Sequence, residues 1–271
     1  MKNNKLYLIP TPIGNYDDIT IRSLKILELV DILLCEDTRE TGKLLNNFNI
    51  KKKLISCHDH NEEHMRSKVI EYLNEGLNIG LVTDQGTPII SDPGYKIVAS
   101  VAKENYSIVS LPGATAFVPA LTLSALAPQP FLFYGFLNSK RSKQLKELDT
   151  LKNYTFTMIF YESPKRLNTT LKNMLEIFGN RKIAIVRELT KKYEEVIRTD
   201  INEYLNNEFE IKGEIVLVIE GIKQNYQNFP IEEHVNLYLQ DNMSLNEAMK
   251  KVAKERGVAK SIIYKEYHQN K

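Results

Sequence analysis

Four polar loops carry residue types that could bind a charged ligand or move a proton. They are residues 11–15 (TPIGN), 36–39 (EDTR), 83–88 (TDQGTP) and 112–115 (PGAT), and each directly follows an apolar run. One such loop alone is ordinary turn chemistry. In open α/β sheets, however, ligands bind outside the carboxyl ends of the strands. Together the four loops therefore predict a single ligand-binding cleft.

Two standard nucleotide-binding motifs are missing from the sequence. No G-x-G-x-x-G follows the first apolar run, and G-x-x-x-x-G-K-[ST] does not occur. These glycine-rich loops are the usual cradles for dinucleotides and nucleoside triphosphates. The sequence therefore argues against both of these cofactor classes.

A histidine-rich segment suggests a metal site at first sight. Neutral imidazoles are common metal ligands, and carboxylates lie beside them. The intervals match no standard zinc signature, and Cys35 and Cys57 lack a partner at ligand spacing. We therefore expect a polar loop beside the cleft and no metal. The segment contains His58, Asp59, His60, Glu62 and His64.

The first part of the chain, residues 1–127, reads as an α/β lobe. Apolar residues recur at near-helical spacing over 21–30 and 69–73, and Gly76 is placed to end the second helix. Alternation of such helices with buried strands predicts a largely parallel sheet. The predicted strands are residues 6–9, 32–35, 79–82 and 108–111.

A second α/β lobe is predicted over residues 128–224. Pro128 and Pro130 interrupt any continuing helix and mark the boundary with the first lobe. Helices are expected over 165–178 and 201–207. The strands predicted for this lobe are residues 131–136, 155–161, 183–186 and 215–219.

Residues 230–271 are predicted to form a small helical unit. The polar text KQNYQNFP precedes them, Ser244 and Glu247 form a capping-box signature, and Gly257 stands where a helix would end. Helix, turn, helix is the natural interpretation of 244–268. From 243 to 271, seven Lys or Arg stand against three Glu, so this tail concentrates positive charge.

Composition restricts the class of protein further. A chain of 271 residues with 42% hydrophobic content is too long for a single small module. A net charge of +2 means that any nucleic-acid contact must come from local patches. Two cysteines, no apolar signal segment and no apolar run of about 18 residues favour a soluble cytoplasmic protein without disulfides or a membrane span.

Five stretches, taken in order, resemble the tetrapyrrole methylase superfamily, and within it the enzymes that methylate small-subunit ribosomal RNA. The stretches are LYLIPTPIGNYDDIT, CEDTRETGKLL, VTDQGTPIISDPGY, FYESPKR and KGEIVLVIEG. The resemblance implies a two-lobed α/β fold with a small C-terminal helical unit, usually a homodimer. It also implies that S-adenosylmethionine binds between the lobes and methylates a cytidine 2′-oxygen in the decoding region of 16S rRNA, within the small ribosomal subunit.

The same resemblance implies which residues lie near the cofactor. The methionine portion would lie beside the 83–88 and 112–115 loops, where a glycine backbone allows close approach. Pro10 would wall the same cleft, and residues of the second lobe would enclose the adenosine. The cofactor residues implied are Pro10, Asp84, Gly86, Thr87, Ala114, Thr115, Tyr161, Leu189 and Gly213.

The acceptor side is expected to involve Glu36, Asp37 and Arg39, since Arg suits bidentate phosphate recognition. The alternative is an internal ion pair between Asp37 and Arg39. Glu36, Asp37 and Asp92 are the candidates for a general base, and a mechanism without a dedicated base remains open. Lysines of the tail could attract RNA phosphates or could form a solvated helix face.

Two other functions fit parts of the sequence. A methyltransferase of the same superfamily acting on a porphyrin-like ring or a modified protein side chain would share the cofactor loops but would not need the basic tail. A noncatalytic ribosome-binding factor could keep the cleft without turnover. Retention of all four loops favours an enzyme, and the tail favours RNA as its substrate.

Overall fold

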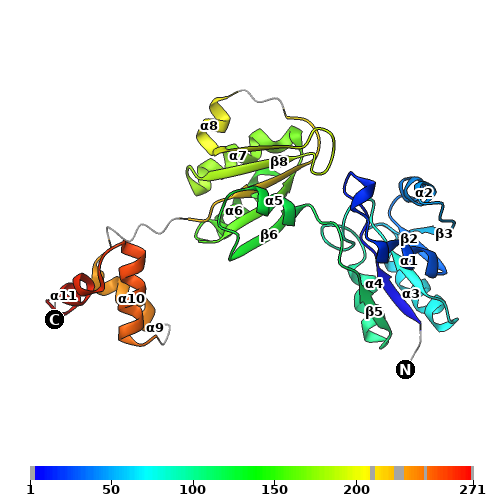
Figure 1. The fold of residues 1–271 in the computed structure, drawn as a ribbon, viewed down its shortest axis with the longest axis horizontal. Helices are drawn as coiled ribbons and strands as arrows, with labels where there is room; N and C mark the ends of the chain where they lie inside the picture. The colour runs from blue at the N-terminus through cyan, green and yellow to red at the C-terminus, as the bar shows by residue number, and fades with distance from the viewer. Residues whose placement is uncertain (1–3, 208–210, 223–228, 241–242, 270–271) are drawn as a thin grey trace. The chain divides into compact units, whose positions relative to one another are not determined.

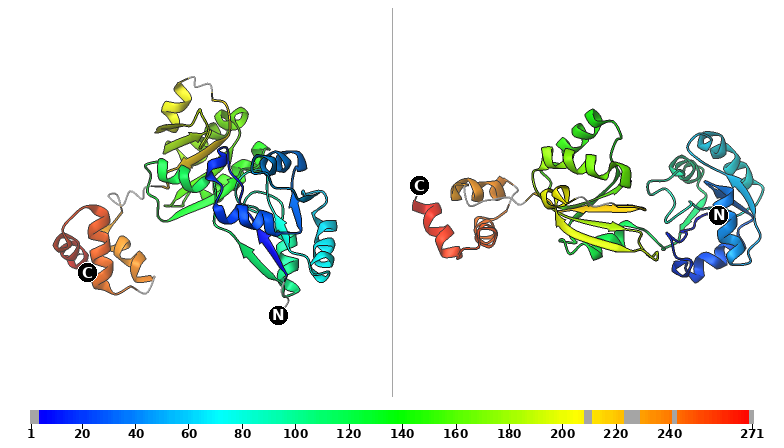
Figure 2. Two further views of the ribbon diagram at one scale, coloured as in Figure 1. Left: turned by 45° about the vertical axis from the view of Figure 1, so that its right-hand side comes forward. Right: turned by 90° about the horizontal axis from the view of Figure 1, so that it is seen from above.

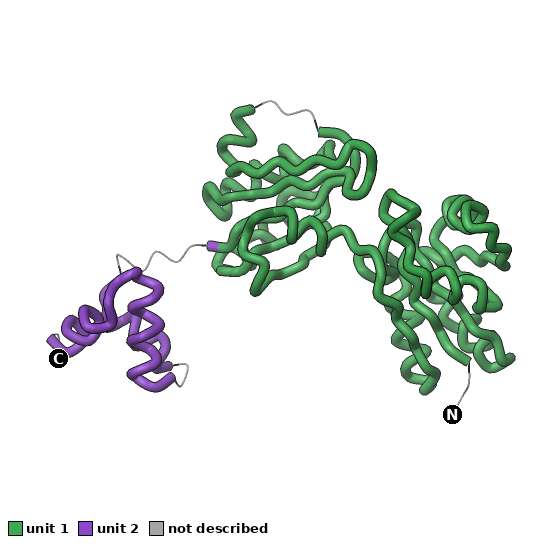
Figure 3. The backbone as a smooth tube through the Cα atoms, viewed as in Figure 1, with its two compact units in different colours: residues 1–221 green, residues 222–271 purple. Residues whose placement is uncertain are grey.

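The computed structural model describes residues 4–207, 211–222, 229–240 and 243–269. The chain divides into two compact units, residues 1–221 and 222–271 (Figure 3). Residues 223–228 of the predicted polar linker lie outside the described residues. Within the described part of the chain, no helix is long and apolar enough to span a membrane.

The first lobe of unit 1 is built on a five-stranded sheet in the order β3-β2-β4-β1-β5, with every pair parallel (Figure 1). The predicted parallel sheet is therefore confirmed. Because β1 lies between β4 and β5, Leu6 is in register with both Ile79 and Ile108. The strands are β1 (Lys5–Leu8), β2 (Ile32–Cys35), β3 (Lys53–Ser56), β4 (Ile79–Leu81) and β5 (Ser107–Ser110).

Helices cover both faces of this sheet. Successive side chains of β1 point to opposite faces, and the buried residues on each face are apolar. Leu6 and Leu8 belong to the buried cluster that includes side chains of α3 and α4. Tyr7 and Ile9 belong to the cluster that includes side chains of α1 and α2. The helices are α1 (Ile21–Leu29), α2 (Thr38–Asn47), α3 (Glu62–Asn74) and α4 (Tyr95–Lys103), with a 3-10 turn at Tyr16–Asp18.

One expectation for this sheet is wrong. The strand predicted over 108–111 was expected to be buried, but Ser107 and Ser110 of β5 are exposed and the two residues between them are half-buried. An edge strand has a neighbour on one side only, so its polar ends meet solvent. The opposite edge, β3, was not predicted, since its KLIS text forms only a short and mixed apolar run.

The second lobe is a mixed sheet in the order β6-β7-β10-β8-β9. Only β6 and β7 pair in parallel, and the other neighbours are antiparallel. The central strand, β10, is buried at every residue. The strands are β6 (Phe131–Phe136), β7 (Thr157–Glu162), β8 (Lys182–Arg187), β9 (Glu195–Asp200) and β10 (Ile215–Ile219).

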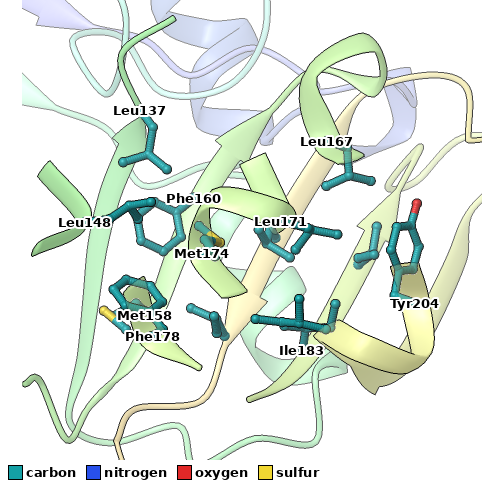
Figure 4. Close-up of a cluster of buried hydrophobic side chains, with 14 of the residues drawn as sticks. Leu137, Leu148, Met158, Phe160, Leu167, Leu171, Met174, Phe178, Ile183 and Tyr204 are labelled. Atoms are coloured by element: carbon teal, nitrogen blue, oxygen red, sulfur yellow. The ribbon is translucent and has the colours of Figure 1, made fainter. Parts of the chain in front are cut away.

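Three helices pack on one face of the second sheet: α6 (Arg141–Leu151), α7 (Pro164–Phe178) and α8 (Ile201–Asn206). Figure 4 shows Leu148, Leu171 and Tyr204 in the core between these helices and the strands. Figure 2 shows the ribbon of the chain in two further views. The other face is covered by α5 (Phe117–Leu123), whose Ala120 and Leu121 pack against β7, β8 and β10. Thus α5 packs on the second sheet although it precedes residue 127.

Unit 2 contains α9 (Ile231–Gln240), α10 (Leu245–Arg256) and α11 (Lys260–Gln269). The predicted capping box is confirmed, because the side chains of Ser244 and Glu247 each accept the other residue's backbone N–H. Gly257 ends α10 in the left-handed conformation at φ 64°. The three helices share one small apolar core. Its fully buried members include Val235, Met249, Val252, Ile263 and Tyr267.

A buried histidine makes the stability of unit 2 sensitive to pH. His234 is fully buried, its Nε2 lies 2.9 Å from Glu255, and its Nδ1 accepts the Nε–H of Arg256 at 3.1 Å. Burial lowers the pKa of His234 below 6.5. The unfolded chain therefore binds a proton more readily, and the free energy of unfolding of unit 2 should fall as pH drops below 6.5.

Hydrogen exchange of peptides covering residues 231–269 between pH 7.5 and 5.5, corrected for intrinsic exchange, measures this loss of protection. His234→Gln should remove the pH dependence. His268→Gln is the matched control, since His268 is exposed and should leave the dependence intact. Equal protection across the pH range in the unchanged chain would contradict the expectation.

Candidate functional site

A cavity of about 430 Å³ lies in unit 1 and is lined by residues of both lobes. Ligand sites of small molecules are typically about 300–1,000 Å³. The loop between β4 and α4, together with Ile13, Thr115 and Ala116, forms one part of the lining. The ends of β7, β8 and β10 form the other part. The lining residues are Ile13, Asp84, Gln85, Gly86, Thr87, Ile90, Ser91, Asp92, Thr115, Ala116, Phe136, Tyr161, Glu162, Ser163, Pro164, Val186, Leu189, Gly213, Glu214, Ile215 and Val216.

The four polar loops of the first lobe are joined to one another by hydrogen bonds. The N–H groups of Thr11 and Gly86 each donate to the other's carbonyl, at 2.9 and 3.0 Å. The Thr87 hydroxyl donates to the Ala114 carbonyl at 2.9 Å, and the Asp37 N–H donates to Asp84 Oδ1 at 3.1 Å. The predicted convergence of these loops is therefore confirmed.

Glycine is required where the loops meet. Gly86 has φ 86°, and a Cβ there would lie 3.3 Å from the Ile13 side chain. A Cβ on Gly113 would lie 2.5 Å from Pro10. Pro10 and Ala114, both predicted at the cofactor, are not among the lining residues. Both residues contact the loops that form the wall. Pro10 packs on Gly113, and the Ala114 carbonyl accepts the Thr87 hydroxyl.

The remaining predicted cofactor residues all line the cavity. Asp84, Gly86, Thr87 and Thr115 come from the first lobe, and Tyr161, Leu189 and Gly213 come from the second. Burial raises the pKa of Tyr161 to about 12. Its ring packs edge-on against Phe133 and Phe136, with centroids 5.0 and 5.5 Å away.

Every charged residue in the lining is acidic. Asp84, Asp92, Glu162 and Glu214 are present, and the described lining contains no Lys, Arg or His. Glu162 is 3% exposed and accepts the Ser163 N–H and the Thr170 hydroxyl, at 2.8 and 2.6 Å. Glu162 pairs with Arg166 at 3.3 Å and Glu214 pairs with Lys191 at 3.0 Å. Asp84 and Asp92 are therefore the carboxylates by which the cavity favours a cationic ligand over phosphates.

Asp92 has the most perturbed carboxyl group of the lining. Burial raises its pKa to about 6, and the carboxylates of Glu36 and Asp84 act in the same direction. Burial also raises the pKa values of Glu36 and Asp84. A carboxyl group that titrates this close to neutrality is suited to proton transfer.

The other predicted acceptor-side residues lie outside the lining. Asp37 caps α2 by accepting the Arg39 N–H at 2.8 Å, and its carboxylate also contacts the Arg39 guanidinium at 2.6 Å. These hydrogen bonds from Arg39 lower the pKa of Asp37 to about 2. The ion pair anticipated as the alternative is therefore present, although the Arg39 side chain is 83% exposed rather than internal.

The histidine-rich segment contributes structure at the start of α3, and none of its residues is among the lining residues. Asn61 accepts the His58 N–H and donates to the Ser56 carbonyl, at 2.9 and 3.0 Å, which fixes the entry to α3. Among the residues that the structure describes, no group of three or more His, Cys, Asp or Glu side chains could hold a metal ion.

Several lining residues were not predicted. Ile90 and Ser91 lie in a loop where Ile89 and Ser91 have φ of 78° and 68°. Left-handed backbone is a genuine outlier for a β-branched residue such as Ile, so composition gave no signal for this conformation. Phe136 and Val216 are apolar strand residues, which periodicity places in a sheet without indicating which ones face a cavity.

Gly213 offers a test of the second-lobe wall. Its φ is 90°, and a Cβ would lie 2.4 Å from the Glu188 carboxylate, which accepts the Glu214 N–H at 2.9 Å. Gly213→Ala should displace Glu188 and break that bond. Gly76, with φ 97° and open space around it, is the matched control for backbone strain alone.

We expect Gly76→Ala to lower the free energy of unfolding by about 1 kcal/mol. Gly213→Ala should cost at least about 1 kcal/mol more, because contact is added to strain. Denaturant unfolding of both variants measures the difference. Equal losses would mean that Glu188 moves aside without cost.

Comparison with known proteins gives the same family from the sequence and the same fold from the structure. Residues 5–204 match the family Tetrapyrrole (Corrin/Porphyrin) Methylases. Among solved structures, the methyltransferase CobJ superposes with a TM-score of 0.63 at 15% identity, over 82% of this chain and 95% of that one. Uroporphyrin-III C-methyltransferase from Thermus thermophilus, complexed with S-adenosyl homocysteine, gives 0.59 at 15% identity, over 80% and 97%. The expected two-lobed fold is confirmed.

Closer relatives share almost the whole chain. Ribosomal RNA small subunit methyltransferase I of Bacillus subtilis is 46% identical, over 97% of this chain and 94% of its own length. The protein of the same name from Escherichia coli O157:H7 is 39% identical, over 96% and 93%. The chain therefore belongs to the tetrapyrrole methylase family, within the group of ribosomal RNA small subunit methyltransferases I.

Proposed function

We propose that this protein transfers the methyl group of S-adenosylmethionine to the ribose 2′-oxygen of a cytidine in the decoding region of 16S rRNA. The observation that carries the proposal is identity of 39–46% along nearly the full chain with enzymes named for small-subunit ribosomal RNA methylation. The cavity supplies the chemical support. No observation favours a tetrapyrrole or protein substrate over RNA.

The lining fits S-adenosylmethionine in charge and size. This cofactor carries a sulfonium, an ammonium and a carboxylate group, so its net charge is positive, and the charged residues of the described lining are all acidic. A cavity of about 430 Å³ is large enough for a ligand of this class. The open backbone at Gly86 allows close approach of a ligand to the first-lobe wall.

The residues that would hold the cofactor follow from this fit. Asp84, Gly86, Thr87 and Thr115 would hold its methionine portion, and Tyr161, Leu189 and Gly213 would enclose its adenosine. When bound, S-adenosylmethionine supplies an electrophilic methyl group on sulfur. The chain has to align the acceptor oxygen with that carbon and to exclude competing water.

We assign proton removal to Asp92. Its carboxylate lines the cavity, and its pKa of about 6 leaves it ionised at neutral pH yet basic enough to accept a hydroxyl proton as the methyl transfers. Glu36, the neighbouring carboxylate, raises the pKa of Asp92 and would keep it near neutrality. Asp37 caps α2 and pairs with Arg39 in the structure, and contact of Arg39 with RNA phosphate stays a prediction.

Unit 2 would supply affinity for RNA. Lys250, Lys251 and Lys254 are exposed on α10, and Lys265 is exposed on α11. Phosphate contacts of this kind add sequence-independent affinity that weakens with salt. The homodimer implied by the resemblance and the cytoplasmic location expected from the composition also stay predictions. Sedimentation of the purified chain tests the first of them.

Labelled S-adenosylmethionine, incubated with the protein and either free 16S rRNA or small subunits from cells lacking this enzyme, tests the function. Digestion to nucleosides and mass spectrometry should find the label on a cytidine ribose. Label on base atoms, or on neither substrate, would contradict the proposal. Transfer to a porphyrin-like ring or a protein instead would favour the alternatives within the family.

A further inference from the structure

The loop that carries Asp92 has a backbone that its own residues do not favour. Ile89 and Ser91 are left-handed, with φ of 78° and 68°. Each such residue costs on the order of 1–3 kcal/mol and persists only when its surroundings hold it. Asp92 follows Ser91 directly, so whatever holds this loop also fixes the backbone position from which the Asp92 carboxylate projects.

The loop leads directly into α4, and the start of α4 lacks a cap of its own. Gly94 is the N-cap residue, with φ 126° and no side-chain cap bond. A Cβ on Gly94 would lie 2.7 Å from the Leu81 side chain of β4, so the backbone here is pressed against the sheet. The N–H groups at this helix start need an acceptor from elsewhere in the fold.

Glu62 is that acceptor. Its carboxylate belongs to α3, is 6% exposed, and accepts the N–H groups of Gly94 at 3.1 Å and Lys96 at 2.8 Å through one oxygen, Oε1. A negative charge at a helix N-terminus is also favoured by the helix dipole. The side chain thus ties the turn after Asp92 to a different helix, 32 residues earlier in the chain.

α3 is a rigid support for this bond. Met65, Val69 and Leu73 of α3 are buried in the same cluster as Ile97 and Val101 of α4. The start of α3 is fixed by Asn61, which bonds to both His58 and Ser56. Glu62 therefore transmits a fixed position from the core of the first lobe to the loop at the cavity.

We infer that Glu62 is a positioning residue of the methyl-transfer reaction, which holds the 87–94 loop so that the Asp92 carboxylate faces the acceptor oxygen. The inference rests on the proposed role of Asp92. Glu62 lies outside the lining of the cavity and acts only through the start of α4.

Two substitutions separate positioning from folding. Glu62→Ala removes the acceptor, whereas Glu62→Gln keeps a side-chain oxygen able to accept both N–H groups. Glu63→Gln is the matched control, because Glu63 is the next residue, is 61% exposed and pairs with Arg66 on the surface. Thermal unfolding reports how much of each variant is folded at the assay temperature.

We expect kcat per folded molecule to fall about tenfold to hundredfold in Glu62→Ala, since displacement of a catalytic group by about 1 Å can cost this much. The KM for small subunits should change little. Glu62→Gln should recover most of the rate, and Glu63→Gln should match the unchanged chain. An unaltered kcat in folded Glu62→Ala would overturn the inference.

The pKa of Asp92 gives a readout that a purely structural role would not move. In Glu62→Ala the released carboxyl group should become more hydrated, so its pKa should fall from about 6 toward 3.8. Carboxyl ¹³C titration by NMR, assigned from the signal missing in Asp92→Asn, measures this without any substrate. A pKa that stays near 6 in Glu62→Ala overturns the inference.

This titration also separates the two hypotheses. If the unchanged chain transfers no methyl group to RNA, the proposed function fails, while the shift of the Asp92 pKa still reports whether Glu62 holds the loop. If Glu62→Ala does not fold, exchange of the Gly94 and Lys96 amides in Glu62→Gln replaces it. Protection near that of the unchanged chain is expected there, and loss of protection without loss of rate would overturn the inference.

Discussion

Asp92→Asn is expected to lower kcat/KM for methyl transfer by about 10²–10⁴-fold, the usual contribution of a general base. The amide keeps the size of the side chain but cannot accept the ribose proton. In the unchanged enzyme kcat/KM should rise with pH and level off above about 6, as Asp92 ionises. The variant should lack this rise of kcat/KM with pH. Initial rates between pH 5 and 8 measure both effects.

Asp59→Asn is the control for a change of charge near the same group. The Asp59 carboxylate raises the pKa of Asp92 but is not among the lining residues. Removal of the Asp59 charge should move the rise of kcat/KM to lower pH and leave the rate above pH 7 unchanged. A loss of less than twofold in Asp92→Asn would assign proton removal elsewhere, with Glu36 as the next candidate.

Gly86→Val should weaken binding of S-adenosylmethionine by about 10- to 100-fold, which corresponds to the 1–3 kcal/mol usual for overpacking a fitted site. A Cβ at Gly86 would already lie 3.3 Å from Ile13 and 3.6 Å from the Ala114 carbonyl. The two further methyl groups of valine must therefore enter the cavity or push its walls apart. Isothermal titration calorimetry measures the change.

Gly179→Val separates this effect from backbone strain. Gly179 has φ 72°, close to the 86° of Gly86, but has no atom within 4 Å of its Cβ position and lies at the end of α7. Both variants should lose stability, and only Gly86→Val should lose affinity. Equal affinity in the two variants would place the cofactor outside this cavity.

The sequence was sufficient to predict four of the five strands of the first-lobe sheet and the meeting of its loops. Runs such as 32–35 are apolar on both faces, as buried parallel strands require. The carboxyl ends of parallel strands share one edge, so their loops must be neighbours. The confirmed bonds between Thr11 and Gly86 and between Asp37 and Asp84 follow from that geometry.

Sequence patterns alone could not predict the edge strands β3 and β9 or the second-lobe wall. β9 reads EVIRTD and is half-exposed, so it lacks an apolar run. The second sheet is mixed, so the rule that ligands bind at the carboxyl ends of parallel strands does not indicate which of its residues line the cavity. Tyr161, Leu189 and Gly213 were predicted from family resemblance and not from periodicity.

Glu62 was also beyond prediction, for a different reason. Among the six His, Asp and Glu residues between 58 and 64, nothing in composition distinguishes a buried cap from a solvated side chain. Its partner N–H groups lie 32 and 34 residues later in the chain, and their need for an acceptor arises only once Gly94 starts a helix without a cap.

The acidic lining has a consequence for turnover. Methyl transfer removes the sulfonium charge, so the spent cofactor carries one positive charge fewer than the form that entered. Asp84 then loses part of its electrostatic attraction to the occupant, and Asp92 loses its own charge by accepting the ribose proton. The weaker attraction favours exchange of the spent cofactor for a fresh one.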